Sequence, residues 1–583
     1  MKISIIIPTF DRCKLLQRTL PTILAQKLKG GEFEILVVSD GCTDGTFSWL
    51  KELNEASFLR VFEQPNRGPG AARNYAAHEA TGDVLLFLDD DLVCLPNLAQ
   101  QHLTAHQKFP HSVVSGLVRL ADEGTGNVVH WHFEDIHRKY LLRMVGKTTP
   151  QWPYDAVFYA NSSVPRADFL ACGGYDEGFG LALEDVELGV RFWKAGLHFH
   201  LLQDAVTEHI HVKSANAIAR IDGEAYGRSE YRLVNKHKGL RPLAEITRLS
   251  SGPFHVQWVR HTALALLPLS DLCLMFLTAV TEMARARGMA VQMLRYRHAL
   301  WRLHGAIKAA GNSTTLQQVL GQRLPVLLYH HVGPLLPGAF AALTVTPEDF
   351  TEHMEWLHLH GFIPVRPEDW ERWVNGEGVL PKNPILITFD DAYSDLAEFV
   401  FPILEARKWP ATVFVVTDEI GGSNSWDQAK GCARISCLNA AQIQDWAQRG
   451  ILFGAHSRSH ADLVTIGTEQ IHHEVKGSKT SLMQTLSMSF SAVANCFAYP
   501  YGSWSENVRD VVAKDFKMAF TTKAGVNDCS TPLLELKRAM VIRSHTLWSL
   551  RKLLAVGWDA PLITTAARKI WAGMRRLFVD APL

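Results

Sequence analysis

The sequence predicts an α/β protein of two or three domains, with a doubly wound sheet in its first half. The 583 residues are more than one hydrophobic core ordinarily organises. Short apolar runs alternate with stretches of helical spacing, as expected of a parallel sheet covered by helices. Several of these runs end in carboxylates, and the carboxyl ends of parallel strands are where open α/β sheets bind ligands.

Composition argues against one class of function. The formal net charge is +0, and neither half has the basic field of a nucleic-acid-binding protein. The nine cysteines are scattered without a CxxC pair, which is typical of reduced thiols in the cytosol. The apolar run 3–8 is too short for a secretory signal and is followed at once by Asp11 and Arg12. We therefore expect a cytoplasmic protein without a nucleic-acid partner.

The first half is organised around residues 82–92, GDVLLFLDDDL. The apolar run predicts a buried parallel strand, and the strand stops at Asp89, Asp90 and Asp91. Because side chains alternate along a strand, Asp89 and Asp91 can face one side while Asp90 points away. Two such carboxylates repel unless a divalent cation lies between them and the phosphates of a substrate. An acidic loop cap is the alternative on these residues alone.

Two further features of the first half suit a nucleotide. Asp40 follows the predicted buried strand 34–38, although it could also cap the next helix. Residues 66–74, NRGPGAARN, combine a glycine turn, a helix start and two arginines, Arg67 and Arg73. Backbone N–H groups and guanidinium groups in such a segment suit a phosphate or the sugar of a nucleotide. Predicted strands at 3–7 and 59–63 and predicted helices at 14–26 and 47–53 complete the alternation.

Acidic residues gather again where a helix is predicted to begin, at Glu184, Asp185 and Glu187. The helix dipole alone favours carboxylates in a first turn, so this cluster also has a purely structural explanation. His209 and His211 follow, and two isolated histidines are more often surface or core residues than ligands.

Taken in order, five motifs in residues 1–213 resemble inverting glycosyltransferase family 2, which has the GT-A fold. They are IIPTFDR, VVSDG, NRGPGAARN, FLDDDL and the pair GGYDEGFG and EDVELGVRFWKAG. The resemblance implies a nucleotide-sugar donor, with a UDP-sugar favoured, and a glycan or lipid-linked acceptor. It implies that the donor is bound by Pro8, Asp11, Asp40, Arg73 and Asp89. It implies that Asp89 and Asp91 bind Mg or Mn, with His209 on the metal side of the site. It also implies that Glu184-Asp185 deprotonates the acceptor hydroxyl, with Asp185 favoured.

The middle of the chain contains an apolar run, 263–281, of about the length of a membrane-spanning helix. Asp271 lies at its centre and would cost about 3 kcal/mol in a spanning helix. If this run spanned the membrane with the first half in the cytoplasm, the arginines that follow it would lie on the non-cytoplasmic side, against the positive-inside rule. We expect peripheral contact with the inner face of a membrane, while a single span and a buried helical hairpin remain alternatives. These arginines are Arg285, Arg287, Arg295, Arg297 and Arg302.

The second half repeats the pattern of strands that end in polar groups. The apolar run 385–389 is followed by Asp390 and Asp391, and the run 451–455 by His456 and His460. Two histidines four residues apart lie on one helical face or in a tight turn, at a spacing that suits one metal ion. With a carboxylate as the third ligand, a coordination position stays open for water, although surface histidines also occur at this spacing.

Three motifs in residues 324–543, TFDD, HSxxH and YPYG, resemble the polysaccharide deacetylase family, carbohydrate esterase family 4. The resemblance implies a distorted (β/α) barrel. It also implies Asp391, His456 and His460 as ligands of zinc or another divalent metal, Asp390 as general base, backbone near Tyr501 as oxyanion donor, and His545 as candidate general acid. Many members carry an arginine where this chain has Ala498, so a degenerate binding module is the alternative.

The combined prediction is a bifunctional carbohydrate enzyme, a transferase fused to an N-deacetylase. Its rivals are a transferase with a non-catalytic glycan-binding barrel and a membrane scaffold of a glycan-assembly complex. The last segment predicts a basic amphipathic helix, which suits a membrane surface or docking on the barrel. The predicted segments are 1–240 (transferase), 241–320 (helical linker), 321–550 (deacetylase) and 551–583 (tail).

Overall fold

The structure is a computed structural model in which contacts divide the chain into two compact units. Among the described residues, one unit comprises 1–236 and 262–311, and the other comprises 237–261 and 312–556. The middle of the chain is therefore shared between the units, while the functional limits of the domains stay a prediction. Residues 551–556 of the predicted tail 551–583 belong to helix α22 (Leu547–Val556), and the rest of the tail lies outside the described residues. The structure describes residues 1–53, 57–121, 126–144, 160–180, 182–210, 213–250, 254–336, 341–428, 432–486 and 493–556.

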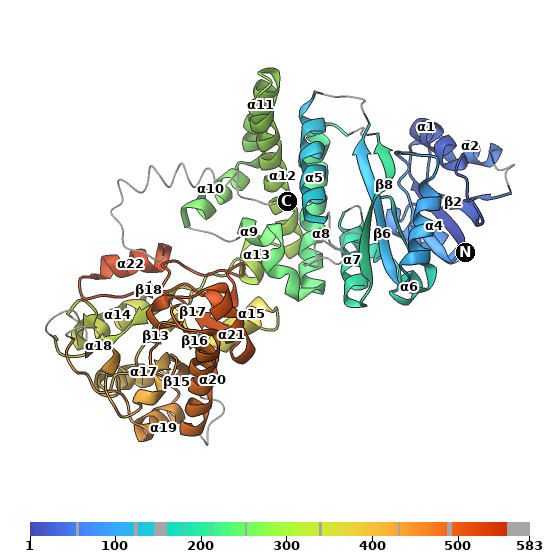
Figure 1. The fold of residues 1–583 in the computed structure, drawn as a ribbon. Coiled ribbons are helices and arrows are strands. Elements are labelled where there is room, and N and C mark those ends of the chain that lie inside the picture. The colour runs from blue at the N-terminus through green and yellow to red at the C-terminus, as the bar shows by residue number, and fades with distance from the viewer. Residues whose placement is uncertain are drawn as a thin grey trace. The chain divides into compact units, whose positions relative to one another are not determined.

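The first unit contains an eight-stranded mixed sheet in the order β3-β2-β1-β4-β7-β6-β8-β5 (Figure 1). The strands β3, β2, β1 and β4 are parallel, while β7 and β5 run antiparallel to their neighbours. The strands are β1 Lys2–Thr9, β2 Glu32–Asp40, β3 Leu59–Gln64, β4 Val84–Phe87, β5 Leu92–Cys94, β6 Ser112–Leu120, β7 Ser162–Pro165 and β8 His198–His209.

Helices cover both faces of this sheet, which confirms the doubly wound α/β prediction. Ile3, Ile5 and Ile7 of β1 pack in a core with α1, α2 and α4, whereas Ile6 packs on the other face with α3 and α7. This division follows from the alternation of side chains along a strand. The helices are α1 Cys13–Leu24, α2 Thr46–Glu52, α3 Pro69–Glu79, α4 Leu98–Lys108, α5 Val128–Met144, α6 Arg166–Ala171 and α7 Glu184–Lys194.

The second unit contains a curled, parallel sheet in the order β17-β16-β15-β14-β13-β9-β18. This is the barrel-like fold expected of a deacetylase, so the fold prediction is confirmed. The strands β10 and β11 form a separate two-stranded sheet, and β12 pairs with β13. The strands of this unit are β9 Val326–Tyr329, β10 His331–Val332, β11 Thr344–Val345, β12 Ile363–Pro364, β13 Pro384–Phe389, β14 Thr412–Val415, β15 Leu452–Ala455, β16 Val493–Ala498, β17 Met518–Phe520 and β18 Ala539–Met540.

Helices surround this sheet, and one of them shows how local sequence sets a boundary. Helix α14 begins where predicted, because the Thr346 hydroxyl accepts a hydrogen bond from the Asp349 N–H at 3.1 Å. The helices are α14 Pro347–Leu359, α15 Pro367–Val374, α16 Asp395–Phe399, α17 Phe401–Ala406, α18 Ser425–Gln428, α19 Ala440–Gln448, α20 Thr468–Thr485, α21 Glu506–Asp515 and α22 Leu547–Val556.

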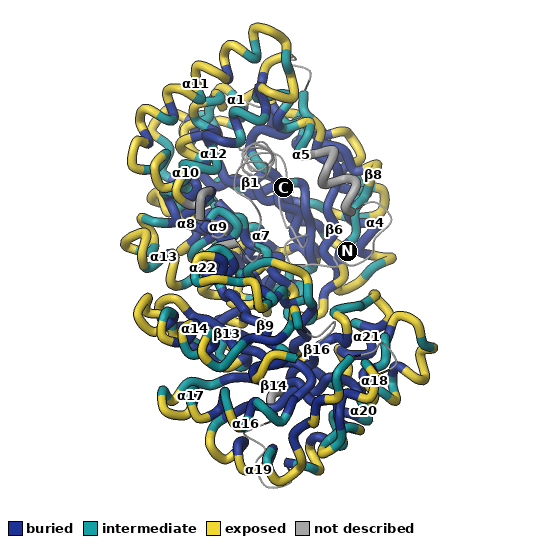
Figure 2. The backbone as a smooth tube through the Cα atoms, turned by 90° about the vertical axis from the view of Figure 1, so that its left-hand side faces the viewer, coloured by how far each residue is buried: buried dark blue, intermediate teal, exposed yellow. Residues whose placement is uncertain are grey.

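The middle of the chain is helical, as predicted, and Figure 2 shows exposed residues along much of α11. Helix α12 packs closely on α8, since a Cβ on Gly227 would lie 1.8 Å from the Arg302 carbonyl oxygen. No single described helix is long and apolar enough to span a membrane. The helices Trp258–Ala265 and Leu267–Met283 reach the required length and apolar composition only when taken together, and they are bent by 98°. The helices are α8 Gly223–Lys236, α9 Glu245–Ser250, α10 Phe254–Ala265, α11 Leu267–Met283, α12 Arg287–Ala310 and α13 Ser313–Leu320.

Candidate active sites

The three consecutive aspartates of the first unit lie in a turn between β4 and β5, not on the strand itself. The prediction that Asp90 points away by strand alternation is therefore wrong. Arg12 binds Asp90 at 2.7 Å and Asp91 at 2.9 Å, and the Thr9 hydroxyl donates to Asp90 at 2.8 Å. Burial raises the pKa of Asp90 to about 6 despite the attraction of Arg12. Asp90 and Asp91 thus fix the turn together through one guanidinium group.

Asp89 is the most exposed of the three aspartates and faces the start of α7. Arg73 donates to Asp89 at 2.7 Å and to Glu184 at 3.2 Å, so one buried arginine joins two acidic segments that are far apart in the sequence. The Arg73 guanidinium also lies 5.3 Å from the centre of the Tyr175 ring. Asn74 fixes the Tyr175 backbone through two hydrogen bonds of 2.7 and 2.9 Å.

Asp185 lies half-buried in the first turn of α7, beside Glu184. Leu183 precedes the helix with a φ of 60°, a left-handed backbone conformation that is costly for a non-glycine residue and is found mainly where function requires it. Burial, and then the neighbouring charge of Glu184, raise the pKa of Asp185 to about 7. A carboxylate with a pKa near neutrality suits a general base, which agrees with the predicted role of Asp185.

Three of the predicted donor-binding residues lie at the carboxyl ends of β1 and β2: Pro8 is in β1, Asp40 is the last residue of β2, and Asp11 is in the loop after β1. Buried Asp40 accepts hydrogen bonds from the Arg67 N–H at 2.9 Å and the Gly68 N–H at 2.8 Å, so it orders the glycine turn before α3. Exposed Asp11 accepts from the Thr43 N–H at 2.6 Å and joins the two loops. Pro8 is buried in β1. The structure assigns Asp40 and Asp11 these ordering contacts, and their contact with a nucleotide remains a prediction.

The ligands predicted for a transferase cation only partly converge. The His209 Nε2 atom lies 3.2 Å from Asp91, and the Asp91 Oδ1 atom is buried without a hydrogen-bond partner. Such a carboxylate oxygen fits Mg or Mn, which prefer oxygen ligands. Among the described residues, however, Asp89, Asp91 and His209 do not form a compact group of three ligand atoms. A cation would therefore need oxygens from a substrate.

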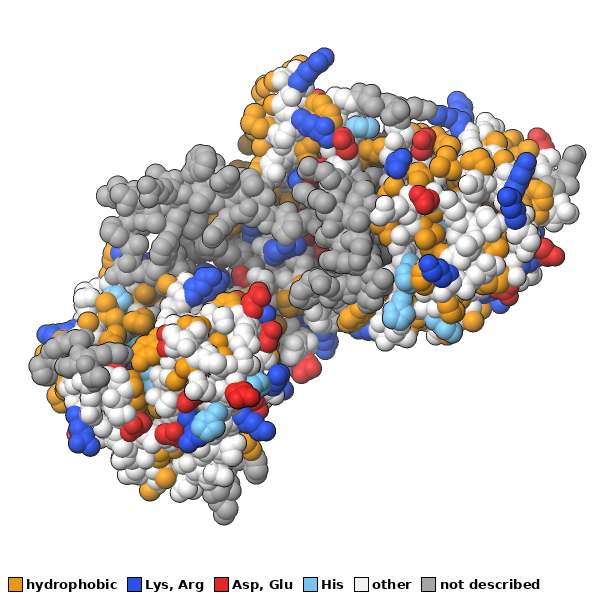
Figure 3. Space-filling view, in the orientation of Figure 1, with side chains coloured by type: hydrophobic (Ala, Val, Ile, Leu, Met, Phe, Trp, Pro, Cys, Tyr) orange, Lys and Arg blue, Asp and Glu red, His pale blue; other side chains and the backbone are white. Residues whose placement is uncertain are grey.

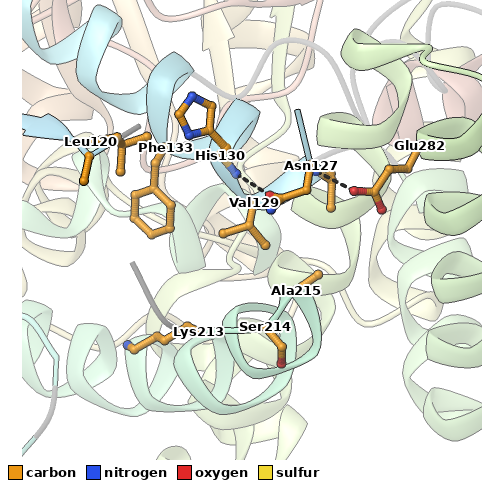
Figure 4. Close-up of a pocket in the computed structure, with 11 residues that line it drawn as sticks. Leu120, Asn127, Val129, His130, Phe133, Lys213, Ser214, Ala215 and Glu282 are labelled. Atoms are coloured by element: carbon orange, nitrogen blue, oxygen red, sulfur yellow. Dashed lines mark hydrogen bonds between the residues drawn. The ribbon is translucent and has the colours of Figure 1, made fainter. Parts of the chain in front are cut away.

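A cavity of about 280 Å³ adjoins this part of the first unit (Figure 4). Residues of α5, the segment 213–215 and Glu282 at the end of α11 line it. Glu282 accepts a hydrogen bond from the Val128 N–H at 2.7 Å. Phe133 lines the cavity, and its ring contacts the ring of His209 at a centroid distance of 6.4 Å. The cavity therefore lies next to His209, the histidine predicted to lie near the transferase cation.

The ligands predicted for the second unit do converge. Atoms of Asp391, His456 and His460 that can bind a metal all lie within 4.8 Å of one another, and all three residues are buried. Asp391 Oδ1 lies 3.7 Å from His456 Nε2 and 3.5 Å from His460 Nε2, and it has no hydrogen-bond partner. Burial and the charge of Asp390 raise the pKa of Asp391 to about 8. One carboxylate and two imidazoles around an unsatisfied oxygen fit zinc or a similar divalent ion.

The chain turn around the histidines presents them to this centre. His456 and His460 lie in a tight turn after β15, so the helical alternative is excluded, and Ser457 and His460 have positive φ angles. The His456 Nδ1 atom lies 2.8 Å from the Ala498 carbonyl oxygen, which leaves Nε2 free to face Asp391. Glu474 accepts from the backbone N–H groups of Arg458 and Ser459 at 2.8 and 3.0 Å and fixes the turn.

Asp390 is held by an arginine that the sequence analysis missed. Arg538 binds it through two hydrogen bonds of 2.6 and 2.8 Å, and both side chains are fully buried. Burial would raise the pKa of Asp390, but Arg538 outweighs this effect and lowers the pKa to about 2. Although position 498 carries alanine, the chain thus supplies a guanidinium group beside Asp390 from the residue before β18. Its only sequence signal is a charge next to a short apolar run.

Aromatic and imidazole groups complete the second site. Trp426 stacks on His460 with ring centroids 4.8 Å apart, and Tyr501 meets the same ring edge-on at 4.6 Å. His330 lies close enough to Asp390 and His456 for both charges to act on it, and burial lowers its pKa to about 4. His545 contacts the Ile542 N–H through Nδ1 at 3.2 Å. Trp426 and His330 were not predicted, because neither belongs to a motif with a recognised spacing.

Comparisons with known proteins support the same division of the chain. The family model "Glycosyl transferase family 2" matches residues 4–160, and the model "Polysaccharide deacetylase" matches residues 377–519. "Uncharacterized glycosyltransferase YfnE" of Bacillus subtilis is 27% identical over 305 residues, 44% of this chain and 75% of that protein. "Validoxylamine A glucosyltransferase" of Streptomyces hygroscopicus subsp. jinggangensis is 31% identical over 219 residues, 33% of this chain and 52% of that protein.

Among solved structures, the Streptococcus pyogenes deacetylase PplD in complex with acetate is 24% identical, with a TM-score of 0.35, over 41% of this chain and 99% of that one. The two folds, the two groups of polar residues and the family matches define a bifunctional carbohydrate enzyme. The chain combines a family 2 glycosyltransferase domain with a polysaccharide deacetylase domain.

Proposed function

We propose that the transferase half moves a sugar, with inversion, from a nucleotide-sugar donor to a hydroxyl of a glycan or lipid-linked acceptor. Asp185 takes the acceptor proton, and its pKa of about 7 supports this role. Arg73 joins Asp89 to Glu184 and so places the donor side of the site against the base. A divalent ion such as Mg or Mn, held by Asp89 and Asp91 with His209 nearby, would neutralise the departing diphosphate. A UDP-sugar is the favoured donor.

We propose that the deacetylase half hydrolyses the acetamide of an N-acetylated sugar. Zinc or another divalent ion held by Asp391, His456 and His460 would supply a Lewis acid for the amide carbonyl and for water. Asp390 accepts the proton of the attacking water, and Arg538 keeps this carboxylate ionised at neutral pH. Backbone near Tyr501 stabilises the oxyanion. The convergence of the three buried ligands is the observation that carries this proposal.

The leaving amine needs a proton, and two histidines are candidates to donate it. His545 is the residue predicted from the sequence. His330 is a second candidate by its position beside Asp390 and His456, but burial lowers its pKa to about 4, so it can donate only a proton that the reaction itself supplies. Comparing His330→Gln with His545→Gln decides between them: the variant of the true acid loses deacetylation about a hundredfold or more, while metal content is unchanged. If both variants keep full activity, neither histidine is the acid.

We further propose that both halves act on one glycan: the first adds an N-acetylhexosamine and the second removes its acetyl group. The test supplies the purified chain with UDP-N-acetylhexosamine and candidate acceptors, and it measures glycan product and released acetate together. Asp390→Asn should accumulate acetylated product. Asp185→Asn should release acetate only when preformed product is added. Acetate released only from glycans that the first domain never makes would refute the coupling.

The donor also bears on location. Because nucleotide sugars are cytosolic, we place the transferase half on the cytoplasmic side, in peripheral contact with the inner face of the membrane. Protease protection of the C-terminal half in sealed vesicles checks this placement. Both halves should be digested from the cytoplasmic side, and protection of the deacetylase half would contradict it.

A further inference from the structure

Helix α11 has its polarity inverted with respect to an ordinary surface helix. The residues that it buries are Leu267, Asp271 and Thr278, two of which are polar. Its outward face is apolar, with Phe276 67% and Met283 77% exposed. Surface helices normally turn their apolar stripe inward, and contiguous apolar surface of this kind marks an interaction site. The other exposed apolar residues along it are Leu266, Leu269, Leu272, Met275, Leu277 and Val280.

Buried polar contacts fix this orientation. Arg297 of α12, which is 1% exposed, donates to Asp271 at 2.8 and 3.3 Å. The same guanidinium group donates to Asn216 at 2.8 Å. At the other end of the helix, Glu282 accepts from the Val128 N–H at 2.7 Å. Rotating α11 to bury its apolar face would expose or separate these pairs, so the outward apolar face is a built feature of the transferase unit.

We propose that the outward face of α11 lies in the interfacial region of an anionic lipid bilayer. From Leu266 to Thr281 this face carries no exposed charged residue, whereas protein interfaces have polar rims. Exposed Arg285 follows the helix directly and suits anionic headgroups, while the neighbouring Arg287 is paired with Glu134 at 2.6 Å. Figure 3 shows apolar side chains gathered over α11. The proposal rests on the peripheral membrane contact in the proposed function and names the surface that makes it, where a lipid-linked acceptor would be met.

Cys273 offers a direct probe, because it is the only exposed residue among the nine free cysteines and lies on α11. The full chain carrying a polarity-sensitive fluorophore at Cys273 is mixed with vesicles of phosphatidylcholine alone or with vesicles that also contain about 30% of the anionic lipid phosphatidylglycerol. We expect co-sedimentation with the anionic vesicles and a blue shift of the fluorophore. Labelled Cys273→Ser provides the blank.

Charged substitutions on the face test the contact itself. Phe276→Glu and Leu272→Glu should each weaken vesicle binding about tenfold or more, because each replaces an exposed apolar side chain that the bilayer would bury with a charge. Leu359→Glu is the matched control, since Leu359 is 79% exposed at the end of α14 in the other unit. It should bind vesicles as the unchanged chain does. Circular dichroism and transfer to a soluble acceptor should be unchanged in all three.

Three results would overturn the proposal. The first is an absence of vesicle binding by the labelled chain. The second is binding that Phe276→Glu and Leu272→Glu leave intact. The third is a blue shift that already exists without vesicles. Such a shift would mean that another part of the chain covers the face. If the shift depended on protein concentration, a second copy of the chain would cover it. Transferase and deacetylase activities are measured separately, so their failure would be distinguishable from a failure of membrane contact.

Discussion

The two sites of this chain prepare for a cation in different ways. In the deacetylase half, Asp391, His456 and His460 converge by themselves, and an unsatisfied carboxylate oxygen faces both imidazoles. In the transferase half, the carboxylates form ion pairs with arginines: Arg73 pairs with Asp89, and Arg12 pairs with Asp91. Structural and catalytic zinc sites are built from protein ligands, whereas Mg is commonly bound by one or two carboxylates together with substrate phosphates. We infer that the deacetylase site binds its ion without a substrate, and that the transferase site needs its nucleotide-sugar donor to bind one.

The largest expected effect comes from removing a ligand of the converged site. His456→Ala should remove the bound metal and lower deacetylation about a thousandfold, because the ion contributes several kcal/mol to the reaction. Transfer activity should not change. Metal analysis and acetate release measure the effect, with His360→Ala as a control because His360 is exposed. Retained metal in His456→Ala would place the ion elsewhere.

In the transferase half, the largest effect should come from the base. Asp185→Asn should lower kcat for transfer about a thousandfold, since a general base typically contributes 10²- to 10⁴-fold. Deacetylation of an added N-acetylated glycan should be unchanged, because Asp185 belongs to the other unit. Asp204→Asn, at an exposed aspartate, is the control. Equal transfer rates for both variants would remove Asp185 from the mechanism.

Stability should separate the sites as well. Arg538→Met leaves Asp390 buried without its partner, and breaking a buried pair in this way costs about 3–5 kcal/mol of unfolding free energy. Denaturant unfolding of the second unit measures the loss. Arg449→Met, which breaks an exposed pair with Glu405, should have no measurable effect. A fully stable Arg538→Met protein would show that Asp390 is neutral in the folded chain.

The smallest effect is a pH dependence confined to the transferase. Asp185 must be unprotonated to act, and burial raises its pKa to about 7. Therefore kcat/KM for transfer should be constant above that pH and should fall about tenfold per unit below it. The profile is measured with saturating metal. A flat profile down to pH 5 would mean that the base titrates as an ordinary carboxyl group.

Local patterns were enough to predict the strands and helices and to name candidate ligand positions. Strands 84–87 and 384–389 were predictable because an apolar run that stops on carboxylates has a simple physical meaning. The turn at Asp89–Asp91 was not, because Thr9 and Arg12, at the end of the neighbouring strand β1 and in the loop after it, shape the turn. Arg538 and Asp390 are 148 residues apart, so no local pattern could pair them.

The middle of the chain shows the same limit. Composition indicated an apolar helix with a central aspartate, but the face that it turns outward depends on the pairing of Asp271 with Arg297. Likewise, the absence of an arginine at 498 gave a reason to doubt the deacetylase, and only the fold places Arg538 beside Asp390. Sequence motifs located the sites, whereas the partners that set charge and orientation required the three-dimensional structure.

The most direct test of the contrast between the sites is a metal titration of the full chain with and without UDP. We predict one tightly bound zinc or similar ion per chain in the absence of the nucleotide, lost in His456→Ala. A second ion, for which Mn is the titrant, should bind only when UDP is present. Its binding should be lost in Asp91→Asn. Two tightly bound ions without UDP, or a second ion whose affinity is the same with and without UDP, would contradict the account.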